Sequence, residues 1–298
     1  MDVVGIVGAG QMGRGITQVF AMAGFHVVLY DLHSKILEEA IAELTKRLNE
    51  SIKKKELTEW VREKILKNIK ATIRPEDLTG ADIIFEAVPE KEEIKADVFE
   101  MLDELCSPEI LLATTTSSLS ITRLATIVAQ PERFIGIHFI YPAYSVPIVE
   151  MVRGFKTSDA TFSKTKQIIE KLGKTIIVSK DFPGFIINRI LLMMINEAVF
   201  TIMEGVGSVE DIDRALKIGA GMTAGPLRMA DAIGLDVCLD ILEILHAEFG
   251  DSKYRPSPLL RKYVEAGMLG LKSGKGFYDY SADYTVPERE KKTIHLIN

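Results

Sequence analysis

The sequence predicts an α/β domain built on a doubly wound, mostly parallel sheet, followed by an all-helical C-terminal domain. Over the first two thirds of the 298 residues, short apolar runs alternate with longer segments of helical periodicity. This alternation is typical of parallel sheets that are covered by helices. A glycine-rich turn joins the first apolar run to the first helical segment, and no strand pattern recurs after Asp181.

Strands are predicted where short runs are rich in β-branched or aromatic residues. These runs are Val3–Val7, Val27–Tyr30, Ile83–Phe85, Ile110–Ala113, Phe134–Ile137, Val146–Val152 and Thr175–Ser179. Helices are predicted where apolar residues recur at three- and four-residue spacing. These segments are Gln11–Met22, Lys35–Lys55, Thr58–Asn68, Lys91–Leu105, Asp159–Leu172, Phe185–Glu204, Val209–Lys217 and Leu235–Glu248.

The predicted boundary between the two domains is the segment DFPG at residues 181–184. Asp181 can cap a helix, and Pro183 is favoured in the first turn of one. The length agrees with two domains, since about 150 residues per domain are usual. We therefore expect an α/β domain over residues 1–182 and a helical domain over residues 183–298.

Composition indicates a globular protein and excludes several classes of function. Hydrophobic residues make up 47% and charged residues 26% of the chain, which rules out a disordered or collagen-like protein. The net charge of −6 disfavours nucleic acid and anionic lipid as partners, although a local basic cluster can still hold one anionic ligand. The apolar stretches are interrupted well short of the roughly 18 residues that a membrane span needs. We also see no signal-peptide pattern at the N-terminus.

The chain contains two cysteines, Cys106 and Cys238, without CxxC or Cys/His ligand spacing. Neither a disulfide scaffold nor a structural zinc site is therefore expected, and no metal is predicted. This cysteine usage leads us to expect a protein of the reducing cytoplasm.

A GxGxxG motif, GAGQMG at residues 8–13, lies directly after the first strand and opens the first helix. This context is that of a Rossmann-type dinucleotide site. Gly8 permits the tight turn, Gly10 lets the backbone approach a pyrophosphate, and Gly13 lets helix and strand pack closely. The helix N-terminus, at Gln11 and Met12, presents N–H groups and a positive dipole end to the phosphates.

Asp31 ends the second strand, 18 residues after Gly13. An acidic side chain at this place accepts hydrogen bonds from the adenine ribose and repels a 2′-phosphate, so NAD is favoured over NADP. The alternative is a plain glycine-rich turn followed by a surface aspartate. The context of the motif and the acidic residue together favour the dinucleotide site, although a fold does not name a substrate.

His138 is the histidine with the clearest chemical setting. It closes the apolar run Phe134–Ile137, and ligands of open α/β sheets bind at the carboxyl ends of strands. Glu150 follows twelve residues later, where a neighbouring strand could bring it beside the imidazole. Such a carboxylate fixes the tautomer and stabilises the imidazolium that forms when the other ring nitrogen takes a proton. The alternative is a core histidine whose hydrogen bonds are satisfied locally.

An asparagine and a run of hydroxyl side chains are further candidates. Asn188 is a lone amide in the otherwise apolar segment 185–195, and it suits either a ligand contact or a core hydrogen bond. The run TTTSS at residues 114–118 follows the strand Ile110–Ala113. It therefore supplies hydroxyl groups at the same edge of the predicted sheet as His138.

Seven segments taken together are recognisable, and they keep their order and spacing from residue 1 to about residue 281. They are GAGQMGRGI, FEAVPEKEEIK, TTSSLSIT, HFIYP, VEMV, DFPGFIINR and LKSGKGFYDY. This combination resembles the 3-hydroxyacyl-CoA dehydrogenase family, and its short-chain 3-hydroxybutyryl-CoA dehydrogenases most closely. The resemblance implies oxidation of an L-3-hydroxyacyl-CoA to the 3-oxoacyl-CoA with transfer of a hydride to NAD, or the reverse reaction.

The resemblance also implies roles for individual residues. His138 matches the family's general base, Glu150 the carboxylate that orients it, and Ser117 and Asn188 the residues that contact the substrate. Ser117 also belongs to the implied cofactor site.

The resemblance adds Glu90 and Lys95 to the cofactor site, on the ribose and nicotinamide side. Without it, an exposed and charged helix start would be the simpler interpretation of these two residues.

A basic cluster is the candidate for binding the phosphates of CoA. The resemblance places the CoA-binding helix at Ser51 and the lysines of residues 53–55, with Lys54 as the best match. The alternative is a solvated helix face. The family also implies a homodimer through the helical domain, in which residues 191–194 form either interface or core. For residues 270–276 we expect a turn that packs the C-terminal part of the chain, the alternative being a substrate contact.

Two positions depart from the family pattern. The usual SNTSSL is TTTSSL at residues 114–119, so Thr115 replaces an asparagine. The usual HFxNP is HFIYP, so Tyr141 replaces a second asparagine. Each exchange removes an amide that both donates and accepts hydrogen bonds.

Two other functions remain as alternatives. The stretch PAYSVPIVE at residues 142–150 is more similar to relatives that act on free hydroxy acids, the L-gulonate 3-dehydrogenase, carnitine dehydrogenase and lambda-crystallin branch. The segments at residues 225–236 and 254–260 are more similar to the butyryl-CoA branch, so CoA substrates are favoured. The second alternative is a dinucleotide-binding paralogue with little activity, which the intact set of predicted catalytic residues argues against.

Overall fold

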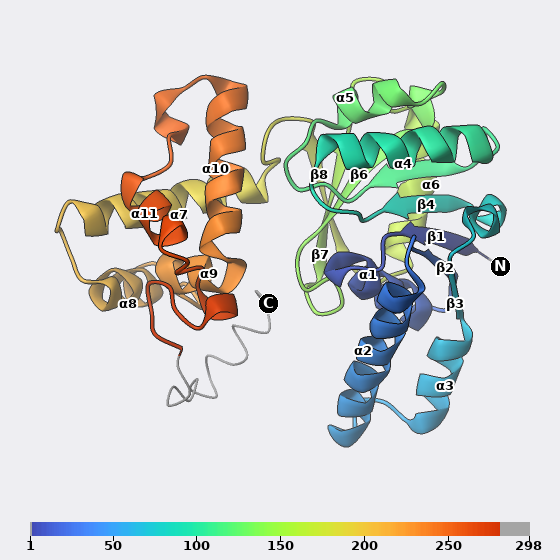
Figure 1. The fold of residues 1–298 in the computed structure, drawn as a ribbon, viewed down its shortest axis with the longest axis horizontal. Coiled ribbons are helices and arrows are strands. Elements are labelled where there is room, and N and C mark those ends of the chain that lie inside the picture. Colours follow the sequence, from blue (N-terminus) through green and yellow to red (C-terminus); the bar gives the residue numbers. More distant parts are fainter. Residues whose placement is uncertain (1, 281–298) are drawn as a thin grey trace. The chain divides into compact units, whose positions relative to one another are not determined.

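The computed structural model describes residues 2–280 of the chain (Figure 1). The chain forms two compact units, Met1–Asp181 and Phe182–Asn298. The first unit is an α/β structure on a mostly parallel sheet, and the described part of the second is helical. The predicted fold class is therefore confirmed.

Within the described residues, the first unit contains an eight-stranded sheet in the order β3-β2-β1-β4-β5-β6-β7-β8. The strands are β1 (Val3–Val7), β2 (His26–Tyr30), β3 (Ile69–Thr72), β4 (Ile83–Glu86), β5 (Leu111–Thr114), β6 (Phe134–Phe139), β7 (Ile148–Arg153) and β8 (Thr175–Lys180). All neighbouring strands are parallel except β6 and β7, which are antiparallel. The order reverses at β1, and doubly wound sheets bind their ligands outside the strand ends at such a point.

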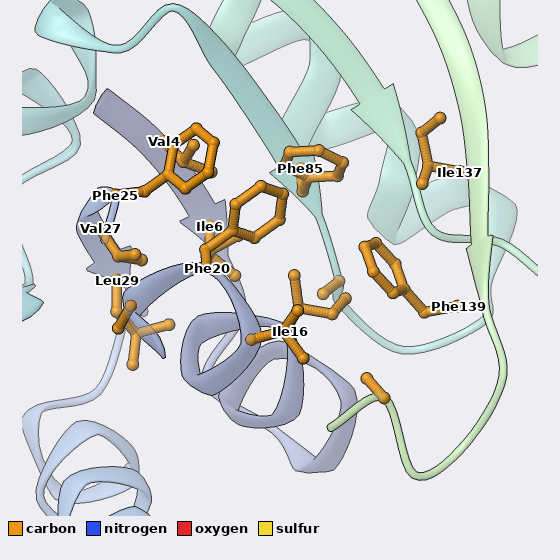
Figure 2. Packing of buried hydrophobic residues seen from close by; sticks show 14 of the residues in the cluster. Val4, Ile6, Ile16, Phe20, Phe25, Val27, Leu29, Phe85, Ile137 and Phe139 are labelled. Carbon is orange, nitrogen blue, oxygen red and sulfur yellow. The ribbon is translucent and has the colours of Figure 1, made fainter. Parts of the chain in front are cut away.

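One apolar core lies between α1 and the sheet (Figure 2). The ring of Phe20 on α1 lies 5.0 Å from that of Phe85 on β4, 5.2 Å from Phe25 and 6.4 Å from Phe139 on β6. Full burial of each such ring contributes about 1.5–3 kcal/mol. This packing fixes α1, and with it the glycine turn that precedes the helix. The helices of this unit are α1 (Gln11–Met22), α2 (Ser34–Lys53), α3 (Glu59–Lys67), α4 (Glu92–Leu105), α5 (Ile121–Leu124) and α6 (Asp159–Glu170).

Strand β6 shows how the two faces of the sheet differ. Ile137 and Phe139 belong to the core that α1 covers, whereas the ring of Phe134 packs edge-on against Phe99 of α4, with the centroids 4.6 Å apart. Side chains alternate between the faces of a strand. His138 therefore lies on the same face as Phe134, the face that α4 covers.

The helices of the second unit pack around a core of their own. Leu192, Ile195 and Val199 recur at three- and four-residue spacing along α7 and share this core with Leu242 of α10. This spacing places the three side chains on one face of the helix. The helices are α7 (Ile187–Met203), α8 (Val209–Gly219), α9 (Pro226–Ile233), α10 (Leu235–Phe249) and α11 (Pro258–Glu265).

The segment after α11 folds back onto α9. The carboxylate of Asp231, which is fully buried, accepts hydrogen bonds from the backbone N–H groups of Phe277 and Tyr278, both at 2.9 Å. The approach is close enough that a Cβ at Gly276 would lie 2.0 Å from Asp231 Oδ1. The prediction that residues 270–276 form a turn that packs the C-terminal part of the chain is confirmed.

The sequence patterns missed β3, α9, α11 and the four-residue helix α5. Strand β3 is at the edge of the sheet and its middle residues, Lys70 and Ala71, are exposed, so it lacks the apolar run of a buried strand. Helices α9 and α11 have eight residues each, which is short for identification by periodicity. His138, expected after the end of a strand, lies inside β6, which continues to Phe139.

Asp181 caps a different helix from the one expected. Its carboxylate accepts hydrogen bonds from the Ser120 hydroxyl and from the backbone N–H groups of Ile121 and Thr122, at 2.7–3.0 Å. It therefore binds the N-terminus of α5 in its own unit. The next helix along the chain, α7, begins at Ile187. Asp181 thus caps a helix that is distant in sequence, because a carboxylate binds the N–H groups that are near it in space.

At about pH 4, replacing Asp231 with Asn should lower the free energy of unfolding by about 1–3 kcal/mol, because an NH2 group replaces one of the two oxygens that accept from backbone N–H groups. Chemical denaturation followed by circular dichroism measures this loss. Glu197→Gln, an exposed exchange on α7, is the matched control and should change stability by no more than about 0.5 kcal/mol. Equal stability of Asp231→Asn and the wild type would contradict the anchoring role of this carboxylate.

The same variant tests a pH dependence. Burial raises the pKa of Asp231 in the folded state above its ordinary value. The stability that this group contributes is therefore fully present below its unfolded pKa, about 3.9, and is lost as the pH rises through the folded pKa. The stability difference between the wild type and Asp231→Asn should shrink as the pH is raised from about 4 towards neutrality, and a difference that grows would contradict the assignment.

Candidate active site

Four neighbouring parallel strands, β1, β4, β5 and β6, end at the same edge of the sheet. The segments after β1, β4 and β5 contain the glycine turn, Glu90 and Ser117, and His138 lies near the end of β6. The glycine turn, Glu90, Ser117 and His138 thus share the edge at which sheets of this type bind ligands.

The glycine turn has the backbone geometry that a pyrophosphate site requires. Gly8 has a φ of +99°, and a Cβ there would lie 2.7 Å from the carbonyl oxygen of Ala87. A Cβ at Gly13 would lie 1.8 Å from the carbonyl oxygen of Gly8, so helix and strand pack too closely for a side chain.

Gly10, by contrast, faces open space. Among the described residues, no atom lies within 4 Å of the position that its Cβ would take, and no side chain caps α1. The N–H groups at the start of α1 are therefore available to phosphate oxygens. The residues present fit the diphosphate of NAD.

Asp31 supports the glycine turn as well as ending β2. Its Oδ2 accepts a hydrogen bond from the backbone N–H of Ala9 at 2.9 Å, and its Oδ1 accepts one from His33 at 3.2 Å. A carboxylate offers about four acceptor positions, so Asp31 can hold the turn and still accept hydrogen bonds from a ribose. Sequence reasoning found the residue but not this second role.

His138 and Glu150 form a buried pair across two antiparallel strands. The register pairs the two residues directly, and His138 Nδ1 lies 2.7 Å from Glu150 Oε2. Only 6% of His138 and none of Glu150 is exposed. Because Glu150 engages Nδ1, Nε2 is the ring nitrogen that can exchange a proton with a ligand. The structure thus brings together the two residues that the sequence predicted to meet.

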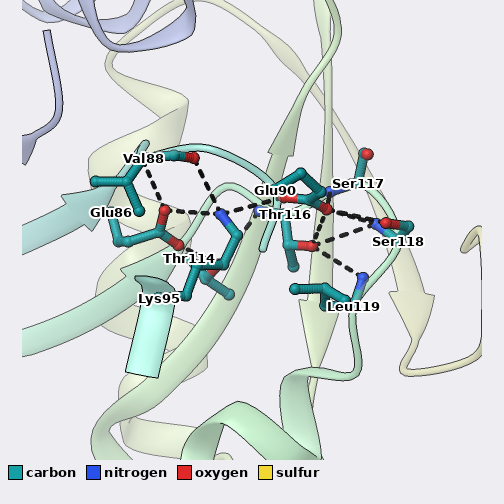
Figure 3. A network of polar contacts seen from close by, with 9 residues as sticks. All are labelled: Glu86, Val88, Glu90, Lys95, Thr114, Thr116, Ser117, Ser118 and Leu119. Carbon is teal, nitrogen blue, oxygen red and sulfur yellow. Dashed lines mark hydrogen bonds and ion pairs between the residues drawn. The ribbon is translucent and has the colours of Figure 1, made fainter. Parts of the chain in front are cut away.

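Ser117 lies in a segment that the carboxylate of Glu90 holds in place (Figure 3). Glu90 Oε1 accepts hydrogen bonds from the hydroxyl of Thr116, from the backbone N–H of Ser117 at 3.0 Å, and from both the N–H and the hydroxyl of Ser118. Four donors on one carboxylate oxygen restrict the backbone around Ser117. Glu90 therefore positions the serine that the resemblance places at the substrate.

Lys95 is buried beneath this segment, with 1% of its side chain exposed. Its Nζ lies 2.7 Å from Glu86 Oε1 and 3.1 Å from Glu90 Oε2. The alternative of an exposed charged helix start is therefore wrong for Lys95. Its direct contact with the cofactor stays a prediction, because in this structure its charge is directed to two carboxylates.

Glu86 and Glu90 respond differently to this setting. Burial raises the pKa of Glu86 above its ordinary value, although Lys95 acts in the opposite direction. Burial also disfavours ionisation of Glu90, but the charge of Lys95 and the hydrogen bond from Thr116 outweigh it, so its pKa is lowered. Glu90 therefore stays ionised at neutral pH, as its four donors require.

The basic cluster proposed for CoA lies at the end of α2. Ser51 is half-buried in the last turn, and Lys54 is the exposed C-cap residue. Neither lines the open hollow of about 520 Å³ that runs along one face of this helix. The hollow is lined by Ala42, Thr45, Lys46, Asn49, Glu50 and Lys53. Sequence reasoning missed Lys46 and Asn49, although the three-residue step from Lys46 to Asn49 and the four-residue step from Asn49 to Lys53 were visible.

Asn188 lies in the second unit, in the first turn of α7, and is half-buried. The backbone just before it has a left-handed conformation, with a φ of +73° at Gly184 and +47° at Phe185. This turn sets the point at which α7 begins. The role of Asn188 at the substrate stays a prediction.

Comparison with known proteins decides the family. The sequence model of the NAD binding domain of 3-hydroxyacyl-CoA dehydrogenase matches residues 3–182, and that of its C-terminal domain matches residues 184–280. The chain belongs to the 3-hydroxyacyl-CoA dehydrogenase family. The protein is thus an oxidoreductase that uses NAD, and the glycine turn and Asp31 are the part of the structure that fits this cofactor.

Two relatives show how far the similarity of this dehydrogenase extends. It is 51% identical over 286 residues to the 3-hydroxybutyryl-CoA dehydrogenase of Bradyrhizobium diazoefficiens, which covers 96% of this chain and 98% of that protein. It is also similar to the crystal structure of (S)-3-hydroxybutyryl-CoA dehydrogenase from Ralstonia eutropha, with 42% identity and a TM-score of 0.92. That match covers 94% of this chain and 99% of the other.

The described part of the dehydrogenase lacks two features, a helix suited to span a membrane and a cluster of metal ligands. None of its helices in residues 2–280 combines the length and apolar character of a membrane span. The same residues contain no group of three or more His, Cys, Asp or Glu side chains arranged to hold a metal ion.

The main residue that sequence reasoning missed in the dehydrogenase is Glu86. Its buried carboxylate accepts hydrogen bonds from Lys95, from the hydroxyl of Thr114 at 2.7 Å and from the backbone N–H of Val88 at 2.8 Å. The sequence signal for Glu86 was its place directly after the apolar run Ile83–Phe85. An ionisable residue that continues a buried strand needs a partner, because such residues are rarely buried without one. Sequence alone did not indicate which cation would reach it.

Replacing Lys95 with Met should destabilise the dehydrogenase by about 3–5 kcal/mol, because it removes the cation from the fully buried carboxylate of Glu86 as well as from Glu90. The free energy of unfolding by urea measures the effect. Lys166→Met is the matched control, since it removes an exposed ion pair with Glu170 within α6 and should cost no more than about 0.5 kcal/mol. A loss for Lys95→Met as small as that of the control would show that the buried charges are not coupled.

Proposed function

We propose that the dehydrogenase interconverts an L-3-hydroxyacyl-CoA, with 3-hydroxybutyryl-CoA as substrate, and the corresponding 3-oxoacyl-CoA. The observation that supports this best is the buried pair of His138 and Glu150, at 2.7 Å, near the sheet edge that holds the glycine turn. Oxidation of a secondary alcohol needs a base for the hydroxyl proton, and this pair supplies one. The names of the similar proteins support a short-chain CoA substrate.

His138 acts as the general base of this reaction. NAD, when bound, would supply the acceptor for the hydride that leaves C3 of the substrate. His138 Nε2 takes the hydroxyl proton in the same step, so that the C–O bond becomes a carbonyl. General base catalysis of this kind contributes about 10²–10⁴-fold. In the reverse direction the imidazolium returns the proton to the oxygen.

Glu150 orients the base and stabilises its charged form. It accepts a hydrogen bond from Nδ1–H of His138, so the neutral imidazole has its acceptor lone pair on Nε2. Once Nε2 is protonated, the buried carboxylate balances the positive charge. Glu150 is therefore a positioning residue, because it acts through His138.

Ser117 and Asn188 hold the reacting oxygen in this proposal. The hydroxyl and the amide bind the C3 oxygen and fix C3 for hydride transfer, and such orientation lowers the entropic part of the barrier. The support for Ser117 is its backbone, which Glu90 fixes at the same sheet edge. The support for Asn188 is its match to the family pattern.

The hollow along α2 is the proposed site for the nucleotide part of CoA. Lys46 and Lys53 project from one face of the helix with Asn49 between them. Two cations and one amide suit the phosphates and the ribose of CoA. Ser51 lies two residues before Lys53, and Lys54 directly follows it. The acidic net charge of the protein does not oppose this, because the attraction is local.

A free hydroxy acid as substrate is the weaker alternative. Its support was the stretch at residues 142–150, and the structure gives that stretch a packing role. Tyr144 lies under the guanidinium of Arg47, 4.9 Å from ring centroid to Cζ, and Lys174 Nζ binds the carbonyl oxygens of Ala143 and Val146 at 2.7 and 2.6 Å. These packing contacts explain the residues of this stretch, so a free hydroxy acid as substrate is not needed to explain them.

The proposal extends to the two domains, the assembly and the location of the enzyme. Residues 1–182 bind NAD, and residues 183–298 form a helical domain for substrate binding and dimerisation. The homodimer is supported by exposed apolar side chains on this domain, among them Ile190 and Ile218, which are 67% and 79% exposed. A cytoplasmic location is supported by the two buried cysteines, which are both unpaired thiols.

Replacing His138 with Asn should lower kcat by about 10²–10⁴-fold and leave the Kd of NADH within about threefold, because the base acts in the chemical step. Steady-state kinetics with acetoacetyl-CoA and NADH fluorescence measure the two quantities. His246→Asn, an exposed exchange on α10, is the control and should leave both unchanged. A variant that is folded by circular dichroism and turns over normally would remove His138 from the mechanism.

Glu150→Gln keeps the shape of the pair and removes its charge, so it tests the base even if the His138 variant fails to fold. We expect kcat to fall about 10²-fold or more, because the imidazolium loses its buried counter-charge. The pH profile of kcat should shift with it. A fall in kcat without any change of the pH profile would indicate a structural role alone.

Oxidation of NADH with a panel of 3-oxo substrates tests the substrate class. The panel contains acetoacetyl-CoA, a longer 3-oxoacyl-CoA and free oxo acids that include dehydrocarnitine. We expect the highest kcat/KM with acetoacetyl-CoA. Activity with a free acid alone would overturn the proposal, as would binding of NADH without turnover of any substrate.

Within the same assay, Lys46→Ala combined with Lys53→Ala should raise KM for acetoacetyl-CoA about tenfold or more, because each lysine is expected to pair with a phosphate. The KM for the acetoacetyl thioester of N-acetylcysteamine, which lacks the nucleotide part of CoA, should not change. Lys164→Ala, an exposed exchange on α6, is the matched control. An equal rise of KM for both thioesters would exclude the hollow as a nucleotide site.

A further inference from the structure

Tyr141 follows β6 and makes a contact that the family pattern does not predict. The family usually has an asparagine here, whereas in this chain the side-chain amide of Gln11 donates a hydrogen bond to the Tyr141 hydroxyl. Gln11 is exposed and opens α1 directly after Gly10, and Tyr141 is half-buried. The tyrosine therefore reaches from the strand of the proposed base to the turn that fits the diphosphate of NAD.

In this contact the Tyr141 hydroxyl acts as an acceptor, so its O–H group can still donate one hydrogen bond. A phenol both donates and accepts, and here its oxygen accepts from Gln11. The O–H proton then remains for a second partner, and the best acceptors expected at the turn are the anionic oxygens of a diphosphate, which α1 attracts with its N–H groups. A hydrogen bond to a charged oxygen is roughly twice as strong as one between neutral groups.

We propose that Tyr141 is a cofactor-binding residue of this dehydrogenase, and that its hydroxyl, oriented by Gln11, donates a hydrogen bond to the diphosphate of NAD. An asparagine side chain is several ångströms shorter and does not reach Gln11 from the same backbone position. The exchange at residue 141 thus moves a hydrogen-bond donor to the glycine turn. The inference concerns the NAD site and holds whichever hydroxyacyl substrate the enzyme takes.

The segment that follows Tyr141 is held in place before any ligand binds. Ala143 packs against α1 at Gly15, where a Cβ would lie 3.4 Å from the Ala143 side chain. Lys174 Nζ donates to the carbonyl oxygens of Ala143 and Val146. Because these contacts already restrict the backbone, the hydroxyl of Tyr141 loses little further freedom on binding the cofactor.

Binding of NADH, followed by its fluorescence, tests the proposal on the full-length protein. Tyr141→Phe should raise the Kd of NADH about tenfold, because it removes the donor and keeps the ring. Gln11→Ala should raise it less, about threefold, since the tyrosine loses its orientation but not its hydroxyl. The Kd of NADH for the double variant should be at most about twofold higher than that for Tyr141→Phe, because the two residues act through one hydrogen bond.

Fragments of the cofactor distinguish a diphosphate contact from a structural effect. ADP-ribose contains the diphosphate, whereas AMP does not, and both are measured by displacement of NADH. Tyr141→Phe should raise the Kd of ADP-ribose about tenfold and leave the Kd of AMP unchanged. Equal weakening of both fragments would indicate a distorted site and overturn the proposal, as would unchanged binding of NADH. Tyr144→Phe, the same exchange three residues away, is the matched control and should bind all three ligands as the wild type does.

Kinetics provide an independent readout. Tyr141→Phe should raise KM for NAD about tenfold and leave kcat at saturating NAD within about threefold, because the hydroxyl binds the cofactor and takes no part in proton transfer. A loss confined to kcat would overturn the proposal. If the enzyme failed to turn over acyl-CoA substrates at all, the binding experiments would still decide the role of Tyr141.

Discussion

The buried ammonium of Lys95 connects the parts of the site that come from different strands. It binds Glu86 at the end of β4 and Glu90 in the following segment, and Glu86 in turn accepts from Thr114 of β5. Removing the charges of Lys95 and Glu86 from water costs several kcal/mol for each ion, and the pairing offsets this only when the geometry is good. Such a cluster contributes little net stability, so its main effect is to fix the positions of the two carboxylates. Through Glu90 it also fixes the backbone of Ser117.

The contact between His138 and Glu150 depends on the register of two antiparallel strands. His138 and Glu150 face each other because β6 and β7 pair Ile137 with Met151 and Phe139 with Val149 in the same register. A slip by one residue would move Glu150 to the opposite face of the sheet, which the apolar core occupies. Burial of Ile137, Phe139, Val149 and Met151 in that core therefore selects the register that brings His138 and Glu150 together. Packing on one face of the sheet sets the geometry of this buried polar pair on the other face.

The sequence predicted the fold class, most of the strands of the sheet, the glycine turn and the meeting of His138 with Glu150. These features depend on local periodicity or on short motifs, both of which one sequence displays. It did not predict β3, whose exposed Lys70 interrupts the apolar pattern, or the helix that Asp181 caps. Nor did it predict that Lys95 is buried between Glu86 and Glu90. Those outcomes depend on which distant groups meet in space, and periodicity carries no information about that.

The two departures from the family pattern differ in their physical consequence. Thr115 donates its backbone N–H to the carbonyl oxygen of Glu86, a contact that any residue except proline can make, so the loss of the asparagine side chain leaves the local backbone intact. Tyr141 instead gains a partner, because its longer side chain reaches Gln11 at the start of α1. A chain of net charge −6 must hold an anionic cofactor by local donors, which act over a few ångströms and are screened little by their surroundings. An added hydroxyl beside the N–H groups of α1 meets that requirement without adding charge.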